Sequence, residues 1–255
     1  LSHLQGVVEL RHTLPILSNV IIKAEDAQLK LSSTNLDILC SEQISANIDI
    51  NGEISVPAIT LHEIVKKLPH GSDIDISMDE TGNSINIKSG RSRFNLSTLP
   101  TDDFPDISQD DLSVKFVMSV DDLKTMIDKT KFAISNEESR YYLNGIFFHS
   151  AHKNGIDVLR SVATDGHRLA QYDMPLPHGA EKMSGIIIPK KTTLELRRIL
   201  DDANGDVQIE LSSSKVKFVF SEIELVSKVI DGTFPDYTKV IPENNDKKLK
   251  TNITE

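Results

Sequence analysis

Phe104-Pro105-Asp106 recurs as Phe234-Pro235-Asp236, about 130 residues later in the chain. Thr34-Asn35-Leu36-Asp37 and Thr164-Asp165-Gly166-His167 are separated by the same distance along the sequence, and each joins two strand-like runs. Two different motifs that return in the same order at the same spacing indicate an internal duplication.

Two amphipathic stretches belong to the same repeat. Pro57 precedes Ala58–Leu68 and Pro189 precedes Lys190–Leu200, at nearly the same spacing as the other motifs. Solenoid repeats are about 20 to 50 residues long, whereas a unit of about 130 residues can bury a core of its own. We therefore expect two similar domains in tandem. The expected divisions are domain 1 at residues 1–106, a polar linker at residues 107–116, and domain 2 at residues 117–245.

Alternating polar and apolar residues predict strands over most of the chain. Gln28–Leu31, Ile74–Ser77 and Ser84–Lys88 have this period of two, which is typical of half-buried antiparallel strands. Lys153-Asn154-Gly155 predicts a hairpin turn. The predicted fold class is α+β, with strand-rich units that carry about two helices each.

Apolar residues at helical spacing are confined to a few segments. Besides the stretches after Pro57 and Pro189, we predict a helix at Leu1–Leu10 and another after the N-cap candidate Ser119. The apolar positions of the helix after Ser119 are Val120, Leu123, Ile127 and Ile134.

Composition excludes several classes of protein. The 255 residues are 38% hydrophobic and 26% charged, as in ordinary globular proteins. The single cysteine, Cys40, excludes a disulfide framework and favours the reducing cytoplasm. No Cys/His cluster, P-loop or G-x-G-x-x-G motif occurs, so we expect neither a metal nor a cofactor. No run approaches the roughly 18 apolar residues that span a bilayer, so we expect no membrane contact.

The net charge of −10 disfavours nucleic-acid binding by the surface as a whole. Basic residues nevertheless cluster on the two repeated amphipathic stretches, with Lys66 and Lys67 on one and Lys190 and Lys191 on the other. Each cluster alone is typical of a solvated helix face. Their recurrence on equivalent helices favours the alternative, a basic surface that faces a phosphate backbone.

Two further segments each allow two interpretations. Arg140-Tyr141-Tyr142 can pair with phosphate and stack on bases, or can simply pack at the start of a strand. Thr164-Asp165-Gly166-His167-Arg168 can suggest a catalytic group, but Asp-Gly is common in tight strand connections. A hydrolase that uses Asp165, His167 and Arg168 has no supporting motif.

Three segments carry a specific resemblance to a known family. Arg140–Gly145, Ala163–Ala170 and Asp231–Tyr237 closely resemble the bacterial sliding clamps, the beta subunits of DNA polymerase III. Three more segments agree, at Thr13–Leu17, Ser89–Phe94 and Leu96–Pro100.

The resemblance implies a non-catalytic ring. Members of that family have three similar domains, and two subunits close head to tail, as a homodimer, around double-stranded DNA. The chain is then expected to lack the strand before Leu1, to cover two domains, and to begin a third at residues 246–255. The implied role is DNA replication as the processivity factor of the polymerase holoenzyme, a nucleotidyltransferase complex.

The resemblance also implies two sets of site residues. Those expected to contact DNA are Arg11, Arg140, Tyr141, Tyr142, Lys190 and Lys191. Those expected to line a hydrophobic pocket for a short peptide are Leu143, Thr164, Gly166, His167, Arg168, Leu169, Pro235, Lys239 and Val240. Lys239 stands where the family often has arginine, which changes the hydrogen bonding at the rim. The implied peptide donors are the DNA polymerase III catalytic subunit, the clamp loader, other polymerases and repair proteins. A free-standing peptide-binding adaptor that never encircles DNA is the alternative.

Overall fold

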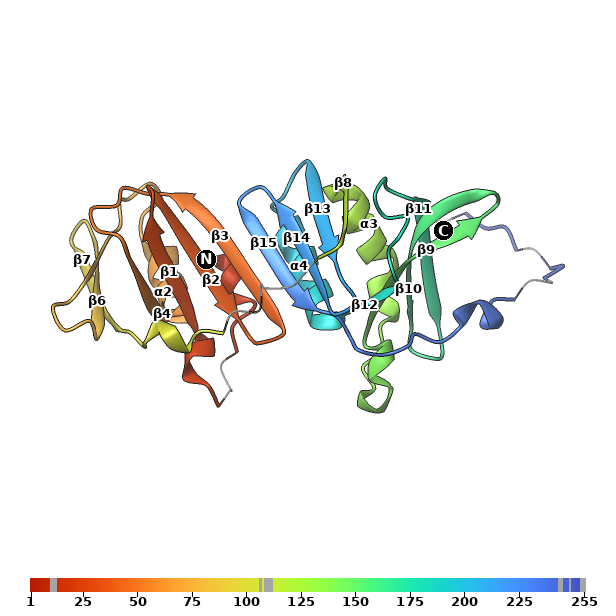
Figure 1. Cartoon of the computed structure of the whole chain (residues 1–255), viewed down its shortest axis with the longest axis horizontal. Coiled ribbons are helices and arrows are strands. Elements are labelled where there is room, and N and C mark those ends of the chain that lie inside the picture. Colours follow the sequence, from red (N-terminus) through yellow and green to blue (C-terminus); the bar gives the residue numbers. More distant parts are fainter. Residues whose placement is uncertain (10–12, 106, 108–111, 243–244, 248, 253–255) are drawn as a thin grey trace.

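The computed structural model describes residues 1–9, 13–105, 107, 112–242, 245–247 and 249–252. Two strand-rich units follow one another in the chain and lie side by side along the long axis of the molecule (Figure 1). None of the described helices is long and apolar enough to cross a membrane.

The first unit contains two helices and seven strands. Its helices are α1 (Ser2–Gln5) and α2 (Ala58–Lys67). Its strands are β1 (Asn19–Glu25), β2 (Gln28–Thr34), β3 (Ile38–Ser45), β4 (Gly52–Pro57), β5 (Asp75–Met78), β6 (Ser84–Ser89) and β7 (Ser92–Ser97). Two 3-10 turns, η1 (Pro15–Ser18) and η2 (Thr101–Asp103), complete it.

The second unit repeats this order and adds one strand at its start. Its helices are α3 (Val120–Thr130) and α4 (Lys190–Leu200). Its strands are β8 (Val114–Ser119), β9 (Gly145–Lys153), β10 (Ile156–Thr164), β11 (Leu169–Pro175), β12 (Ile186–Pro189), β13 (Asp206–Leu211), β14 (Lys215–Phe220) and β15 (Ile223–Lys228). Its 3-10 turns are η3 (Lys131–Ala133), η4 (Glu138–Leu143) and η5 (Tyr237–Val240).

The strand order is the same in both units. The order β4-β1-β2-β3 in the first unit corresponds to β12-β9-β10-β11 in the second, and β5-β6-β7 corresponds to β13-β14-β15. All described pairs are antiparallel, as the period-two alternation predicts. The tandem α+β fold predicted from the sequence is confirmed. The exact divisions at residues 107–116 and 246–255 stay predictions.

One sheet runs through both units. Strand β3 pairs with β15, so that the two halves form an eight-stranded sheet, and Figure 1 shows these two strands meeting at the centre of the molecule. Cys40 lies opposite Leu225 in this pairing, and both side chains are fully buried. Burial raises the pKa of the Cys40 thiol to about 12, so the only cysteine is an unreactive core residue.

Polar contacts also join the two units. Arg198 on α4 donates to the backbone carbonyls of Ser2 (2.8 Å) and His3 (3.0 Å) on α1. Lys191 forms an ion pair with Glu9 at 2.9 Å. The two bonds from Arg198 satisfy carbonyl groups of the first helix and fix its position against α4.

The helices form a continuous row on one side of the strands. Helix α1 contacts both α2 and α4, and α4 contacts α3. The three longer helices, α2, α3 and α4, are amphipathic and bury their apolar side chains against the strands of their own unit, as for Leu61 of α2 and Leu196 of α4. Basic residues on these helices therefore lie on the face away from the sheets.

Two predicted helices are shorter than the sequence pattern suggested. The first ends at Gln5, and Leu10 lies outside the described residues. Helix α3 ends at Thr130, followed by the 3-10 turn η3, so Ile134 lies beyond it in extended backbone. The Thr130 hydroxyl donates to the carbonyl of Met126 (2.7 Å), but Thr125 makes the same kind of bond to Asp121 (2.8 Å) inside α3 without ending the helix, so this bond does not account for the end.

Candidate DNA-facing and peptide-binding sites

The Arg140-Tyr141-Tyr142 segment lies on η4, just before β9. Arg140 has non-helical backbone angles, and its Nε donates to Glu137 at 2.8 Å. The hydrogen bond from Arg140 lowers the pKa of Glu137, so this ion pair is charged at neutral pH. Tyr141 is 53% exposed and packs edge-on against the less exposed Tyr142, with ring centroids 5.7 Å apart. An exposed aromatic ring beside a guanidinium can stack on a base or contact a sugar.

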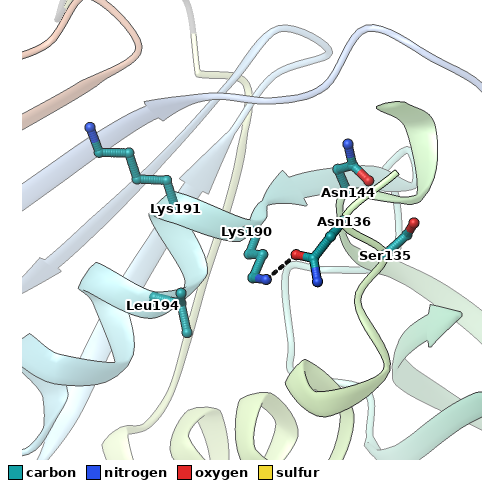
Figure 2. Close-up of a pocket in the computed structure, with 6 residues that line it drawn as sticks. All are labelled: Ser135, Asn136, Asn144, Lys190, Lys191 and Leu194. Atoms are coloured by element: carbon teal, nitrogen blue, oxygen red, sulfur yellow. Dashed lines mark hydrogen bonds between the residues drawn. The ribbon is translucent and has the colours of Figure 1, made fainter. Parts of the chain in front are cut away.

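Lys190 and Lys191 begin helix α4. They border an open recess of about 410 Å³ whose other lining residues are Ser135, Asn136, Asn144 and Leu194. Figure 2 shows Lys190 reaching toward the side chain of Asn136, to which it donates a hydrogen bond, while Lys191 points away from the recess. Free backbone N–H groups at a helix start attract anions, and the two ammonium groups add to that attraction. Arg11, the remaining predicted DNA contact, lies outside the described residues.

The Thr164–Arg168 segment is a tight connection between β10 and β11, as predicted. The Thr164 hydroxyl donates to the carbonyl of Arg168 (2.7 Å) and accepts from the amide of Gly166 (3.1 Å). Asp165 Oδ1 accepts from the amides of His167 and Arg168, each at 3.0 Å. These backbone bonds, the one from His167 first, lower the pKa of Asp165 to about 2.

The first unit has the same network in its equivalent connection, between β2 and β3. Thr34 donates to the carbonyl of Ile38 (2.8 Å) and accepts from the amide of Leu36 (3.1 Å). Asn35 Oδ1 accepts from the amides of Asp37 (3.1 Å) and Ile38 (2.8 Å). The connection is therefore a structural motif of the repeat, and its Asp, His and Arg are not a catalytic set.

One difference separates the two connections. Gly166 has φ +87°, and Leu36 has φ +77° at the equivalent place, where a side chain is strained. A Cβ atom on Gly166 would lie 2.7 Å from Nη1 of Arg140. The predicted peptide segment at Gly166 therefore lies against the end of the Arg140 side chain, in the predicted DNA segment.

Two of the predicted peptide-binding residues lie in one apolar group, here called the Phe234 cluster. Leu143 is 4% exposed and belongs to the buried part of the cluster, and Leu169 packs against it half-buried. The buried members are Leu143, Val162, Ile187, Phe234 and Tyr237, and the partly buried ones are Tyr142, Phe147, Leu169 and Ile230.

The other predicted peptide-binding residues are more exposed. Val240 ends η5 and is 69% exposed, whereas Lys239 is paired with Asp236 at 3.0 Å. Arg168 pairs with Asp165 at 2.9 Å and lies over the exposed ring of Phe132, 5.8 Å from its centroid. Thr164 and Leu169 are half-buried, and Gly166, His167 and Pro235 are exposed.

Several neighbours of these residues were not predicted from the sequence to be part of the peptide-binding site. Val162 and Ile187 look like ordinary strand residues, and only the fold brings them to Leu143. Phe234 could have been identified, because it repeats Phe104, which packs in the equivalent apolar group of the first unit. Tyr237 has no such counterpart, since the equivalent residue of the first unit is Ile107.

The arrangement gives no support to a catalytic or metal site. Among the described residues, no three His, Cys, Asp or Glu side chains are grouped closely enough to hold a metal ion. Asp165 is engaged by backbone amides and by Arg168, so it is not available as a general base.

Comparison with known proteins identifies the family. Residues 1–108 match the N-terminal domain of the DNA polymerase III beta subunit, and residues 117–236 match its central domain. The beta sliding clamp of Caulobacter vibrioides is 49% identical over 249 residues, which cover 98% of this chain and 67% of that protein. The beta sliding clamp of Pseudomonas aeruginosa is 42% identical, with 95% and 65% covered.

Solved structures agree with the sequence comparison. A sliding clamp from Bartonella birtlesii, bound to griselimycin, has a TM-score of 0.92 and 48% identity, covering 96% of this chain and 65% of that one. The Caulobacter crescentus clamp has a TM-score of 0.92 and 49% identity, covering 96% and 66%. The chain thus spans about two thirds of the length of these relatives. It belongs to the family of the DNA polymerase III beta subunits, the beta sliding clamps.

Proposed function

We propose that this chain provides two of the domains of a ring that encircles duplex DNA and tethers the replicative polymerase, without catalysing a reaction itself. The proposed domains are residues 1–106 and 117–245, and residues 246–255 would lead into a third. The proposed compartment is the cytoplasm. The family supports this proposal, and it does not favour a free-standing adaptor.

The observation that carries the proposal is the sheet that continues from one unit to the next. Ile38–Glu42 of β3 pairs with Ile223–Ser227 of β15. Because the two units have the same strand order, β11 is the counterpart of β3, and β7 is the counterpart of β15. Within the described residues both β11 and β7 are edge strands. Each end of the molecule therefore carries one half of a junction like that between β3 and β15.

The β7 end also exposes apolar side chains. Phe94 of β7 is 36% exposed, whereas Ile76 and Met78, 37% and 49% exposed, lie on β5 at the opposite edge of the same three-stranded sheet. An open edge with exposed apolar residues favours pairing with another strand. Head-to-tail contacts of one kind close into a ring when their rotation permits, so β7 would pair with the third domain of a partner subunit.

The proposed DNA contacts are suited to sliding. The proposed set of DNA contacts consists of Arg11, Arg140, Tyr141, Tyr142, Lys190 and Lys191. The three described cations each have an acceptor in the protein, namely Glu137, Asn136 and Glu9. The two glutamates partly neutralise Arg140 and Lys191, which weakens contacts with phosphate, whereas Asn136 is uncharged and leaves the charge of Lys190 in place. Contacts with the DNA backbone alone do not depend on sequence. A ring would then be retained by its topology and not by affinity.

The proposed second activity is the docking of short peptides from the polymerase, the clamp loader and repair proteins. Leu169 and Val240 would contact apolar side chains of the peptide, and His167, Arg168 and Lys239 would form a polar rim. Leu143 would support the site from within, because it is a buried member of the Phe234 cluster against which the partly exposed Leu169 packs.

Calorimetric titration of a peptide from the C-terminus of the polymerase catalytic subunit tests this docking. Leu169→Asp and Val240→Asp should each weaken binding more than about tenfold, since loss of an apolar anchor costs about 2 kcal/mol. Ile156→Asp is the matched control, because Ile156 is 62% exposed at the β9–β10 hairpin. Equal affinity of all three variants would show that the peptide binds elsewhere.

A further inference from the structure

The segment that carries Pro235, Lys239 and Val240 is held to the second unit by side chains. Among the described residues, its last backbone hydrogen bond to a strand runs from the amide of Ile230 to the carbonyl of Ile187 (2.9 Å). After that point the chain crosses the face of β9 and β10 in irregular backbone and the short turn η5. Its position therefore depends on what Phe234 and Tyr237 contact.

Phe234 joins a stack of rings on β9. Its ring lies parallel to Phe147, with centroids 4.9 Å apart and an interplanar angle of 8°. Phe147 in turn stacks on His149, with centroids 4.5 Å apart. Both strand residues come from β9, where alternate side chains share a face, so the stack fixes one end of the segment on the sheet.

Tyr237 fixes the other end through its hydroxyl group. The side chain is 6% exposed, and its oxygen lies 2.9 Å from Nε2 of His149 and 3.1 Å from Nη1 of Arg160. Arg160 forms a two-point ion pair with Asp173, at 2.6 and 3.1 Å. A buried tyrosine hydroxyl with two partners is a strong positional constraint.

The donors and acceptors can be assigned from chemistry. A carbonyl only accepts, so Nδ1 of His149 donates to the carbonyl of Ser150 (2.8 Å). A guanidinium only donates, so Arg160 donates to the oxygen of Tyr237. The proton of the Tyr237 hydroxyl is then free to be donated to Nε2 of His149, which requires a neutral imidazole. Protonation of Nε2 would leave the hydroxyl proton without this acceptor.

The surroundings of His149 oppose its protonation. Burial is the largest effect and lowers the pKa of His149 below its usual value; the hydrogen bond to the Ser150 carbonyl opposes burial, the nearby charge of Arg160 adds to it, and Asp173 has the smallest, opposing effect. Asp173 is itself neutralised by Arg160 and by Lys153 at 2.7 Å. Because the folded pKa is below the ordinary value of about 6.5, His149 is neutral above that pH, and the hydrogen bond from the Tyr237 hydroxyl to Nε2 is lost as the pH falls through the folded pKa.

We propose that Tyr237 is a positioning residue for peptide docking, which holds Pro235, Lys239 and Val240 in place through His149 and Arg160, and does so only while His149 is neutral. This inference rests on the proposed peptide docking. The first unit has no equivalent hydrogen-bonded tyrosine, since Ile107 stands at the position equivalent to Tyr237.

Titration of the fluorescently labelled polymerase-tail peptide with this 255-residue chain, at pH 7.5 and pH 5.5, tests the inference. Wild-type affinity should fall at the lower pH in proportion to the fraction of His149 that is protonated, and by at most about fivefold, the equivalent of about one hydrogen bond. Tyr237→Phe keeps the ring and removes both hydrogen bonds, so its affinity at pH 7.5 should fall about fivefold to tenfold. His149→Phe keeps a ring to stack on Phe147, and its affinity should be low at both pH values.

Tyr172→Phe is the matched control. Tyr172 is half-buried on β11 of the same sheet, and its hydroxyl has no hydrogen bond within the described part of the chain; this variant should bind as the wild type does. His167 lies in the proposed rim of every variant, so only a pH dependence that disappears in His149→Phe belongs to His149.

Two results would contradict the inference in different ways. If the wild type binds the peptide and Tyr237→Phe and His149→Phe show the same affinities and pH dependence, the positioning role is wrong although docking stands. If the wild type binds no peptide at either pH, the docking function fails and the inference fails with it. Imidazole nitrogen shifts of His149 give an independent check, because they should report an Nδ1–H tautomer and a pKa below about 6.5.

Discussion

At the scale of single residues, the repeat is preserved in hydrogen bonds more than in residue identity. Asp165 and Asn35 differ in charge but accept from the same pair of backbone amides in their two units. The side-chain oxygen common to both residues is thus what the connection requires. The charge of Asp165 serves a second purpose, its ion pair with Arg168.

This difference predicts the behaviour of Asp165→Asn in acid. The folded pKa of Asp165 is about 2, below the ordinary value of about 3.9, so its contribution to stability is present above pH 4 and is lost as the pH falls toward 2. The asparagine variant should keep the connection, as Asn35 does, without this dependence. Chemical denaturation at pH 5 and pH 2.5 should show the free energies of unfolding of wild type and variant converging in acid. Parallel curves would contradict the assignment.

Alanine substitutions at two glycines distinguish the energetic cost of backbone strain from that of steric overlap. Gly205 has φ +82° with open space around it, and Gly179 has φ +98° where a Cβ atom would lie 2.3 Å from the carbonyl oxygen of Lys115. Gly205→Ala should lower the free energy of unfolding by about 1 to 2 kcal/mol through strain alone. Gly179→Ala should lower it clearly more, because the backbone of β8 must also move. Equal losses in the free energy of unfolding, measured by urea denaturation, would contradict the predicted steric overlap at Gly179.

At the scale of helices and strands, α3 is the helix whose start the sequence specified most fully. The Ser119 hydroxyl accepts from the amide of Asp122 at 3.0 Å, whereas α2 and α4 begin after a proline without a side-chain cap. Ser119→Ala should lower the free energy of unfolding by about 1 kcal/mol, and Ser119→Asp should restore most of it. Thermal unfolding of the two variants checks this; equal melting temperatures would rule out the cap as the cause.

The strands and helix starts were predictable because their signals are local. Alternation predicted β2 and β6, and Lys153-Asn154-Gly155 predicted the β9–β10 hairpin. The helix ends were less predictable, since α3 ends at Thr130 although the apolar spacing continues to Ile134.

The candidate peptide site was predictable only in part. Family motifs contain Leu143 and Leu169, and the structure brings both into the Phe234 cluster. The motifs do not reveal that Leu143 is buried. They also do not reveal that Tyr237 is bound by His149 and Arg160, because these two contacts join residues 88 and 77 positions apart. Contacts of that separation depend on strand order and are absent from any local pattern.

At the scale of the whole molecule, the duplication can be recognised in the sequence, whereas the junction between β3 and β15 cannot. The duplication is visible as equal spacing of motifs, whereas the pairing of β3 with β15 joins strands that lie near opposite ends of the chain. The proposed ring requires a pairing of the same kind at the edge strands β7 and β11.

Retention of the proposed three-domain protein on nicked circular DNA, compared with the same DNA after linearisation, tests the ring most directly. The account predicts retention on the circle at moderate salt and rapid loss after linearisation, because a closed ring leaves only over a free end. Variants of Lys190 and Lys191 should change retention on the circle little, since topology holds the protein there. Equal loss from circular and linear DNA as the salt concentration rises would indicate ordinary electrostatic binding and would contradict the account.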